Sequence, residues 1–124
     1  MSDRELLELA AKAAGIAAVW SDGEGLACWN DAGYRYFWRP LADDGDALRL
    51  AVKCGIEIWP DREAKEVVVG FCIEKGQNMV GLNFSADFEN DEMAATRLAI
   101  VRAAAQIGDA IRTGGPVWPT SSAP

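Results

Sequence analysis

The segment 38–56 contains all the signals of a complete helical unit, and it constrains the fold more than any other part of the chain. Pro40 keeps the residue before it out of helical geometry, so a helix must begin after this point. Asp43 is placed to cap the free amides of the first turn, and two further aspartates follow at the positive end of the helix. Gly55 supplies the left-handed conformation that ends a helix. The segment therefore predicts one helix between Asp43 and Gly55.

Most of this predicted helix is apolar. Leu48, Ala51 and Val52 share one face, and Arg49 and Lys53 lie one turn apart on the opposite side. Three more residues widen the apolar face, namely Ala47, Leu50 and Cys54. Because only a narrow strip is polar, we expect this helix to pack against the rest of the protein on more than one side.

A second helix is predicted near the start of the chain. Ser2 and Glu5 have the spacing of a capping box, in which each side chain satisfies a backbone amide of the first turn. Leucines and alanines then recur at helical spacing, and Gly15 supplies the stop. We expect this helix to run from Asp3 to Ala14.

The third predicted helix is the longest, with Asn90 as its N-cap and Gly114 at its end. Its core stripe consists of Met93, Thr96, Ile100, Ala103, Ala104, Ile107 and Ile111. Small residues lie outside that stripe, namely Ala94, Ala95, Ala99, Ala105 and Gly108. They indicate a second packing face, covered either by another part of the chain or by a second copy in a homodimer.

Short apolar or alternating runs between the helices predict strands. They are 16–20, 26–29, 34–38, 56–59, 67–73 and 79–84, with a loop at 60–64 and a hairpin turn at 75–78. The run 67–73 is apolar on both faces, as in a central strand covered on both sides. The pattern predicts an α+β fold, an alpha-beta-alpha sandwich with three main helices and a small, mainly antiparallel sheet. We expect one domain over residues 1–115 and a mobile tail over 116–124.

Three segments carry a family resemblance. They are the run from Trp38 to Lys53, the run from Ala94 to Gly108, and the N-terminal run from Leu6 to Ile16. Together they resemble the phage ABA sandwich domain, a family of small tailed-phage proteins that is distantly similar to NinX-like phage proteins. The resemblance implies an alpha-beta-alpha sandwich and a phage or prophage source, with no catalytic residues to carry over. The family usually has Trp-Asn-Pro where this chain has an arginine at position 39, so no role of that asparagine is transferred.

The charge balance disfavours several kinds of partner. With 19 acidic and 12 basic residues the net charge is −7, and scattered basic residues disfavour direct binding of nucleic acid. No apolar run reaches the ~20 residues of a membrane span, and the charged N-terminus lacks the apolar core of a signal peptide. Together with the resemblance, these features predict a protein of the bacterial host cytoplasm.

The sequence contains no recognisable catalytic or cofactor motif. It has no histidine, which excludes histidine-activated nucleophiles and histidine metal ligands, and it has no glycine-rich phosphate loop. The three cysteines lack the spacing of a zinc site, and core packing explains them more simply. Helix caps and solvated loops explain the acidic clusters at 43–46 and 87–92 more simply than a cation site or a mimic of nucleic acid. We expect no enzyme activity, no metal and no cofactor.

Five tryptophans are many for 124 residues, and aromatic side chains often dominate binding surfaces. The candidate binding surface consists of Trp29, Tyr34, Tyr36, Arg39 and Trp59. In this interpretation Arg39 pairs with a carboxylate or phosphate of the partner. The alternative is that the rings fill the core of a small domain, and Trp38 in particular is expected to be buried.

The resemblance implies an accessory protein of a phage or prophage, and the missing catalytic motifs and the aromatic residues indicate that it is a non-enzymatic binding protein. It would bind a host or phage protein, and inhibition of a host defence system is one such role. The alternative is a protein that binds or sequesters a small, nucleotide-like ligand held by tryptophan, Tyr36 and Arg39. Both hypotheses place the binding residues in the aromatic part of the chain.

Overall fold

The structure, a computed structural model, describes residues 2–72, 81–87 and 91–113. In chain order its elements are α1 (Asp3–Ala14), β1 (Ala18–Ser21), β2 (Gly25–Trp29), β3 (Arg35–Trp38), α2 (Asp44–Cys54), β4 (Ile56–Asp61), β5 (Glu66–Cys72), β6 (Gly81–Asp87) and α3 (Glu92–Thr113). None of the described helices is long and apolar enough to cross a membrane. The predicted turn at 75–78, the predicted tail 116–124 and the predicted cap Asn90 lie outside the described residues.

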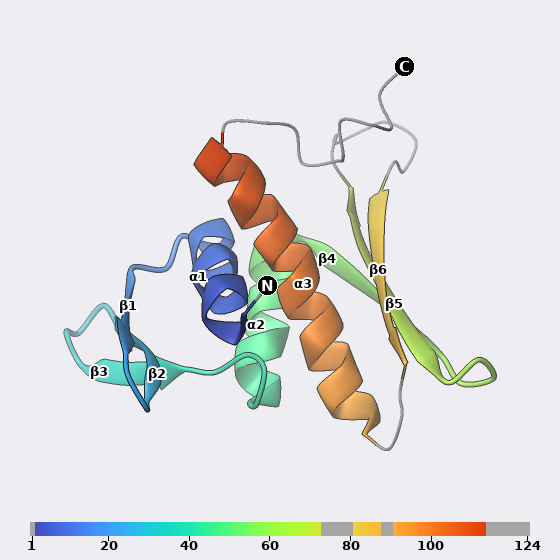
Figure 1. The fold of residues 1–124 in the computed structure, drawn as a ribbon, viewed down its shortest axis with the longest axis horizontal. Helices are drawn as coiled ribbons and strands as arrows, with labels where there is room; N and C mark the ends of the chain where they lie inside the picture. Colours follow the sequence, from blue (N-terminus) through green and yellow to red (C-terminus); the bar gives the residue numbers. More distant parts are fainter. Residues whose placement is uncertain (1, 73–80, 88–90, 114–124) are drawn as a thin grey trace.

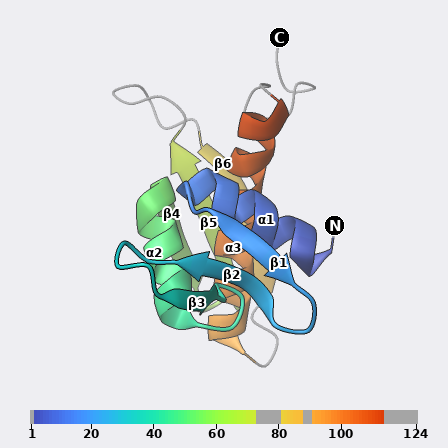
Figure 2. The ribbon, with the colours of Figure 1, turned by 90° about the vertical axis from the view of Figure 1, so that its left-hand side faces the viewer.

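The strands form two antiparallel sheets, whereas the sequence pattern predicts one. The first sheet has the order β1-β2-β3 and the second has the order β4-β5-β6. Figures 1 and 2 show the two sheets on opposite sides of the helices, with α3 lying against the second sheet. The predicted α+β class, in which three helices flank antiparallel sheets as in a sandwich, is confirmed.

The two shorter helices begin and end where their sequences predict. The hydroxyl of Ser2 accepts a backbone hydrogen bond at 3.2 Å, and the carboxylate of Asp43 accepts one at 2.8 Å. Gly15 and Gly55 end the helices with φ angles of 70° and 69°, a conformation that strains any other residue. The bounds of α1 and α2 therefore follow from short-range signals in the sequence.

The long helix ends at Thr113 as predicted, but its N-cap and the burial of its predicted core stripe differ from the prediction. Asp91, expected inside the first turn, is the capping residue, because its Oδ1 accepts a hydrogen bond from the amide of Ala94 at 2.9 Å. Met93 and Ile111 are the first and last residues of the predicted core stripe, but their side chains are 52% and 54% exposed. The buried part of the stripe is its middle, around Ile100.

The small residues of α3 allow α1 to cross it at close range. A Cβ atom added to Gly108 would lie 1.8 Å from the backbone oxygen of Leu9, so only glycine fits at this crossing. Ala99 and Ala105, from the same predicted face, are buried. The second packing face of this helix is therefore covered within one chain, and it no longer indicates a homodimer.

The second sheet is built around β5, which is its central strand as predicted. Val67 and Val69 are fully buried, whereas Val68 on the opposite face is only partly buried. β4 continues to Asp61, past the loop predicted to begin at Pro60. Proline fits in β4 because an edge strand does not need every amide as a hydrogen-bond donor.

One face of α2 is exposed where the sequence predicts burial. Leu48 and Val52 are 58% and 75% exposed, whereas Ala47, Leu50 and Ala51 are buried. The expectation that Leu48 and Val52 join the core is therefore wrong. The neighbouring elements cover only the side of α2 that carries Leu50.

Candidate functional site

The structure separates the five predicted binding residues into different parts of the fold. Trp29 and Arg39 belong to one face of the first sheet, and Tyr34 lies in the adjoining β2–β3 loop. Tyr36 lies on the other face of β3, where it lines a pocket. Trp59 belongs to β4 in the second sheet, across the helices from the first (Figure 1). The predicted surface is therefore not a single patch.

The tryptophans differ in exposure. Trp29 and Trp59 are 52% and 45% exposed, and Trp20 is partly buried. Trp38 is buried, as predicted. Trp118 lies outside the described residues. Two tryptophans of similar exposure are thus presented on two different sheets.

Strand alternation gives the first sheet an inner and an outer face. Leu26, Cys28 and Trp38 belong to the inner face and pack in the core with the helices. The outer face carries Val19, Trp29, Arg35, Phe37 and Arg39. We call these five residues the arginine–aromatic face, and Figure 2 is drawn from the side of the molecule on which this sheet lies.

Two arginines of this face contact the same ring. The Cζ atoms of Arg35 and Arg39 lie 4.9 and 5.1 Å from the centre of the Phe37 ring. Trp29 is the cross-strand partner of Arg35 and extends the apolar area beside it. A cation–π contact at an exposed position contributes about 0.5–1 kcal/mol, which is enough to favour one placement of each guanidinium group.

Hydrogen bonds fix the backbone at both ends of β3. Before the strand, the Oδ1 of Asn30 accepts a hydrogen bond from the amide of Tyr34 at 2.9 Å, and Gly33 with a φ of 86° allows the turn. After the strand, the amide of Arg39 donates to the Oδ2 of Asp46 at 2.9 Å, which ties β3 to the first turn of α2. The arginine side chains therefore project from a backbone that is held in place.

Most other arginines in the described part of the chain are paired with carboxylates. The pairs are Arg4 with Glu8, Arg49 with Asp46, Arg62 with Glu92, Arg97 with Asp44 and Arg112 with Asp109. Among the described residues, no carboxylate oxygen lies within 4.0 Å of the guanidinium nitrogens of Arg35 or Arg39. Within the described residues, these two guanidinium groups therefore have no carboxylate partner, although the chain carries a net charge of −7.

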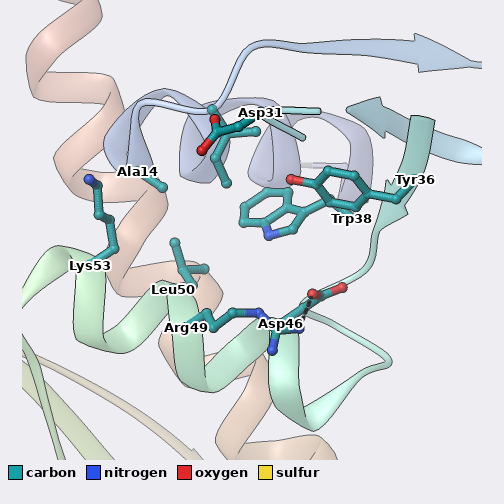
Figure 3. Close-up of a pocket in the computed structure, with 9 residues that line it drawn as sticks. Ala14, Asp31, Tyr36, Trp38, Asp46, Arg49, Leu50 and Lys53 are labelled. Carbon is teal, nitrogen blue, oxygen red and sulfur yellow. Dashed lines mark hydrogen bonds and ion pairs between the residues drawn. The ribbon is translucent and has the colours of Figure 1, made fainter. Parts of the chain in front are cut away.

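A separate pocket of about 640 Å³ lies between β3 and α2, on the inner side of the first sheet (Figure 3). Its polar lining residues are Asp31, Tyr36, Asp46, Arg49 and Lys53. The Nη2 of Arg49 lies 2.7 Å from the Oδ1 of Asp46, so one basic group is already paired. Since two carboxylates and two basic groups share the lining, the pocket is balanced in charge and suits a small polar molecule.

The thiol beside this pocket is not an activated nucleophile. Burial raises the pKa of Cys28, against a smaller lowering by the hydrogen bond that the Tyr36 hydroxyl donates to it. The pKa of Tyr36 is raised as well, by burial and then by the neighbouring Cys28 and Asp46. Both groups are therefore neutral at neutral pH, whereas a reactive cysteine needs a lowered pKa.

No group of three or more cysteine, aspartate or glutamate side chains in the described ranges is arranged to hold a metal ion. The aspartates that follow Pro40 serve the helix instead. Asp43 caps it, Asp44 pairs with Arg97, and Asp46 binds the amide of Arg39. These contacts agree with the structural role predicted for them.

Sequence reasoning grouped Arg39 with Tyr36 and missed Arg49 and Lys53 as pocket residues. Side chains alternate between the two faces of a strand, so residues three apart point to opposite faces. Extending the predicted strand 34–38 by one residue would therefore have placed Arg39 and Tyr36 on different faces. The polar side of α2 was predicted to carry Arg49 and Lys53. No local pattern indicates that this side borders β3.

The chain matches none of the protein-family models, curated proteins or solved structures with which it was compared. Its function must therefore be inferred from its own residues.

Proposed function

We propose that this protein is a non-enzymatic binding protein that recognises another protein through its arginine–aromatic face. The observation that carries the proposal is the exposed pair of Arg35 and Arg39 on the Phe37 ring, beside Trp29. Arginine and tryptophan are among the residue types that most often dominate protein–protein binding energy. Because the two guanidinium groups are already positioned, binding would cost less side-chain entropy than ordering free arginines.

The resemblance to a family of small tailed-phage proteins motivates the choice of partner. Within the proposal, the protein comes from a phage or prophage, acts in the cytoplasm of the bacterial host, and binds a host or phage protein there. Inhibition of a host defence system is the biological role that we assign to this binding. This proposal does not involve the pocket between β3 and α2.

The test uses the two exposed tryptophans as a matched pair. Tagged wild-type protein, Trp29→Ser and Trp59→Ser are incubated with lysate of the bacterial host, and captured proteins are identified by mass spectrometry. We expect the wild-type protein and Trp59→Ser to capture the same partner, and Trp29→Ser to lose it together with any effect on infection. The proposal is wrong if Trp29→Ser keeps the partner, if only Trp59→Ser loses it, or if the wild-type protein captures nothing specific.

A second candidate function is binding of a small, nucleotide-like ligand in the pocket between β3 and α2. The pocket favours it because Tyr36 offers a ring and Arg49 and Lys53 offer positive charge. Arg49, rather than the predicted Arg39, is the arginine within reach of such a ligand.

Thermal unfolding in the presence of a panel of nucleotides tests this candidate. We expect a ligand to raise the Tm of the wild-type protein and of Lys12→Met, a control on α1, but to raise that of Lys53→Met less. If no nucleotide raises the Tm and no ultraviolet-absorbing ligand copurifies with the protein, the small-ligand function is wrong.

A further inference from the structure

We infer that the segment bound by the arginine–aromatic face is an extended, acidic stretch of another protein, with carboxylates on alternate residues. This inference rests on the proposed function and adds the chemistry of the partner. It is carried by the spacing of Arg35 and Arg39, by their lack of a carboxylate partner among the described residues and by the position of β3 at the edge of its sheet.

The spacing follows from the shared contact with Phe37. Because the two Cζ atoms lie 4.9 and 5.1 Å from one ring centre, they are no more than about 10 Å apart. In an extended chain, side chains on alternate residues point the same way and lie about 7 Å apart. Carboxylates with this spacing reach both guanidinium groups at once, and each guanidinium can bind a carboxylate through two hydrogen bonds.

The position of β3 favours an extended ligand. β3 is an edge strand, paired only with β2 among the described residues. The side chains of Arg35, Phe37 and Arg39 lie on one face. In an extended segment beside β3, every second side chain would lie on that same face, next to the two arginines. An extended segment beside an edge strand is a common mode of peptide recognition.

The two arginines suit an acidic partner because, among the described residues, neither has a carboxylate of the protein itself as a partner. Five other arginines of the described chain pair with acidic residues of the protein itself, whereas Arg35 and Arg39 lie over the Phe37 ring. A guanidinium group is weakly hydrated and gives up water for a carboxylate more readily than an ammonium group does. Because the net charge of −7 opposes the approach of any polyanion, the two arginines suit a short acidic stretch better than a long phosphate backbone.

A second copy of this chain also offers acidic residues, on the outer face of the second sheet. Glu57 and Asp61 lie on β4 on either side of Trp59 and share its face. However, the two sheets lie on opposite sides of the molecule, so contact between the first sheet of one copy and the second sheet of another is head-to-tail and forms an open chain of copies unless the rotation between them closes a ring. Such open assemblies are rare among soluble proteins, which favours a different protein as the occupant.

Binding of a labelled peptide tests the inference. The probe is an extended peptide of alternating glutamate and valine, and the control peptide carries glutamine in place of glutamate. Fluorescence anisotropy gives the Kd for the wild-type protein, for Arg35→Gln/Arg39→Gln, for Arg35→Lys/Arg39→Lys and for Arg102→Gln, an exposed arginine on α3. Urea unfolding of each variant confirms that it is folded before binding is compared.

We expect the glutamate peptide to bind the wild-type protein and Arg102→Gln equally, and more weakly as salt is added. Loss of both guanidinium groups should raise the Kd about tenfold or more, because each makes charge-assisted hydrogen bonds, and the lysine variant should recover part of the binding. Equal binding of the glutamine peptide, or no change on removal of both arginines, would overturn the inference. Preference for a single-stranded oligonucleotide over the peptide, or open-ended self-association in sedimentation, would overturn it as well.

Failure of this inference and failure of the proposed function give different results. If lysate capture depends on Trp29 but is unchanged by salt and by Arg35→Gln/Arg39→Gln, the face binds a protein that is not acidic, and only the inference fails. If Trp29→Ser still captures the partner, the face is not the binding surface, and both fail.

Discussion

At the scale of single residues, Gly108 sets the distance between two helices. The backbone oxygen of Leu9 occupies the space where any larger residue would place its Cβ. The contact joins α1 to α3, and both helices contribute to the same buried core. A side chain at this position would have to push a backbone away, because no flexible group is available to move.

We expect Gly108→Ala to lower the free energy of unfolding by at least about 2 kcal/mol, measured by urea unfolding. Gly45→Ala on α2 is the matched control. A Cβ there would meet only the side-chain ends of Arg49 and Asp43 at 3.2 Å, which would have to shift by only a few tenths of an ångström. We expect the control to change stability by less than about 1 kcal/mol. Equal effects of the two substitutions would contradict the close crossing of α1 and α3.

The thiols of Cys28 and Cys54 make the free energy of unfolding depend on pH in the alkaline range. Burial raises the pKa of both thiols from an ordinary value of 9.0, so the folded state holds its protons to a higher pH than the unfolded chain does. Their contribution is fully present below that value and is lost as the pH rises through the raised pKa. We expect the free energy of unfolding to fall above about pH 9, and to fall less steeply in Cys28→Ala/Cys54→Ala. An equally steep fall in the double variant would show that other groups cause it.

At the scale of elements, α2 shows how an apolar helix divides between core and surface. Ala47, Leu50 and Ala51 pack against neighbouring elements, whereas Leu48 and Val52 face away from them. Both sets repeat at helical spacing, so the helix presents two apolar faces. Only the neighbouring elements decide which of them is buried.

The two faces of α2 should respond differently to substitution. We expect Leu50→Ala to cost about 2–5 kcal/mol, because it leaves a cavity in the core. Val52→Lys should change the free energy of unfolding by no more than about 0.5 kcal/mol, since this side chain is 75% exposed. Chemical unfolding of both variants measures the difference. A large loss of stability in Val52→Lys would place this face in a contact that the single chain does not show.

At the scale of the whole molecule, Arg97 joins the start of α2 to the last helix. Its Nε donates to the backbone oxygen of Leu41 at 2.9 Å, and its Nη1 donates to the Oδ1 of Asp44 at 2.5 Å. The side chain is only 15% exposed, whereas that of Asp44 is 58% exposed. One arginine thus links the part of the chain that leaves the first sheet to the helix that covers the second.

We expect Arg97→Met to lower the free energy of unfolding by about 1–3 kcal/mol, because it removes the hydrogen-bond donor of the Leu41 carbonyl. Asp44→Asn leaves that hydrogen bond in place and removes only an exposed charge, so it should cost less than about 1 kcal/mol. Thermal and urea unfolding of the two variants give the comparison. If Asp44→Asn costs as much as Arg97→Met, the ion pair and not the Leu41 hydrogen bond holds this junction.

The amino-acid sequence by itself determined the parts of the protein that depend on neighbouring residues. Ser2, Asp43, Gly15 and Gly55 act within one or two turns of themselves, so the bounds of α1 and α2 could be predicted. The strands on either side of the 30–34 turn follow from alternation and turn residues in the same way. Net charge and the absence of histidine are also properties of the sequence alone.

The tertiary structure decided what depends on residues far apart in the chain. Strand pairing divided the strands between two sheets, and the cover over α2 left Leu48 and Val52 exposed, although their spacing resembles that of a core face. The same packing put Arg39 on the outer face of the first sheet and Tyr36 in a pocket with Arg49. No local pattern contains this information, because a spacing shows which side chains share a face but not what lies opposite that face.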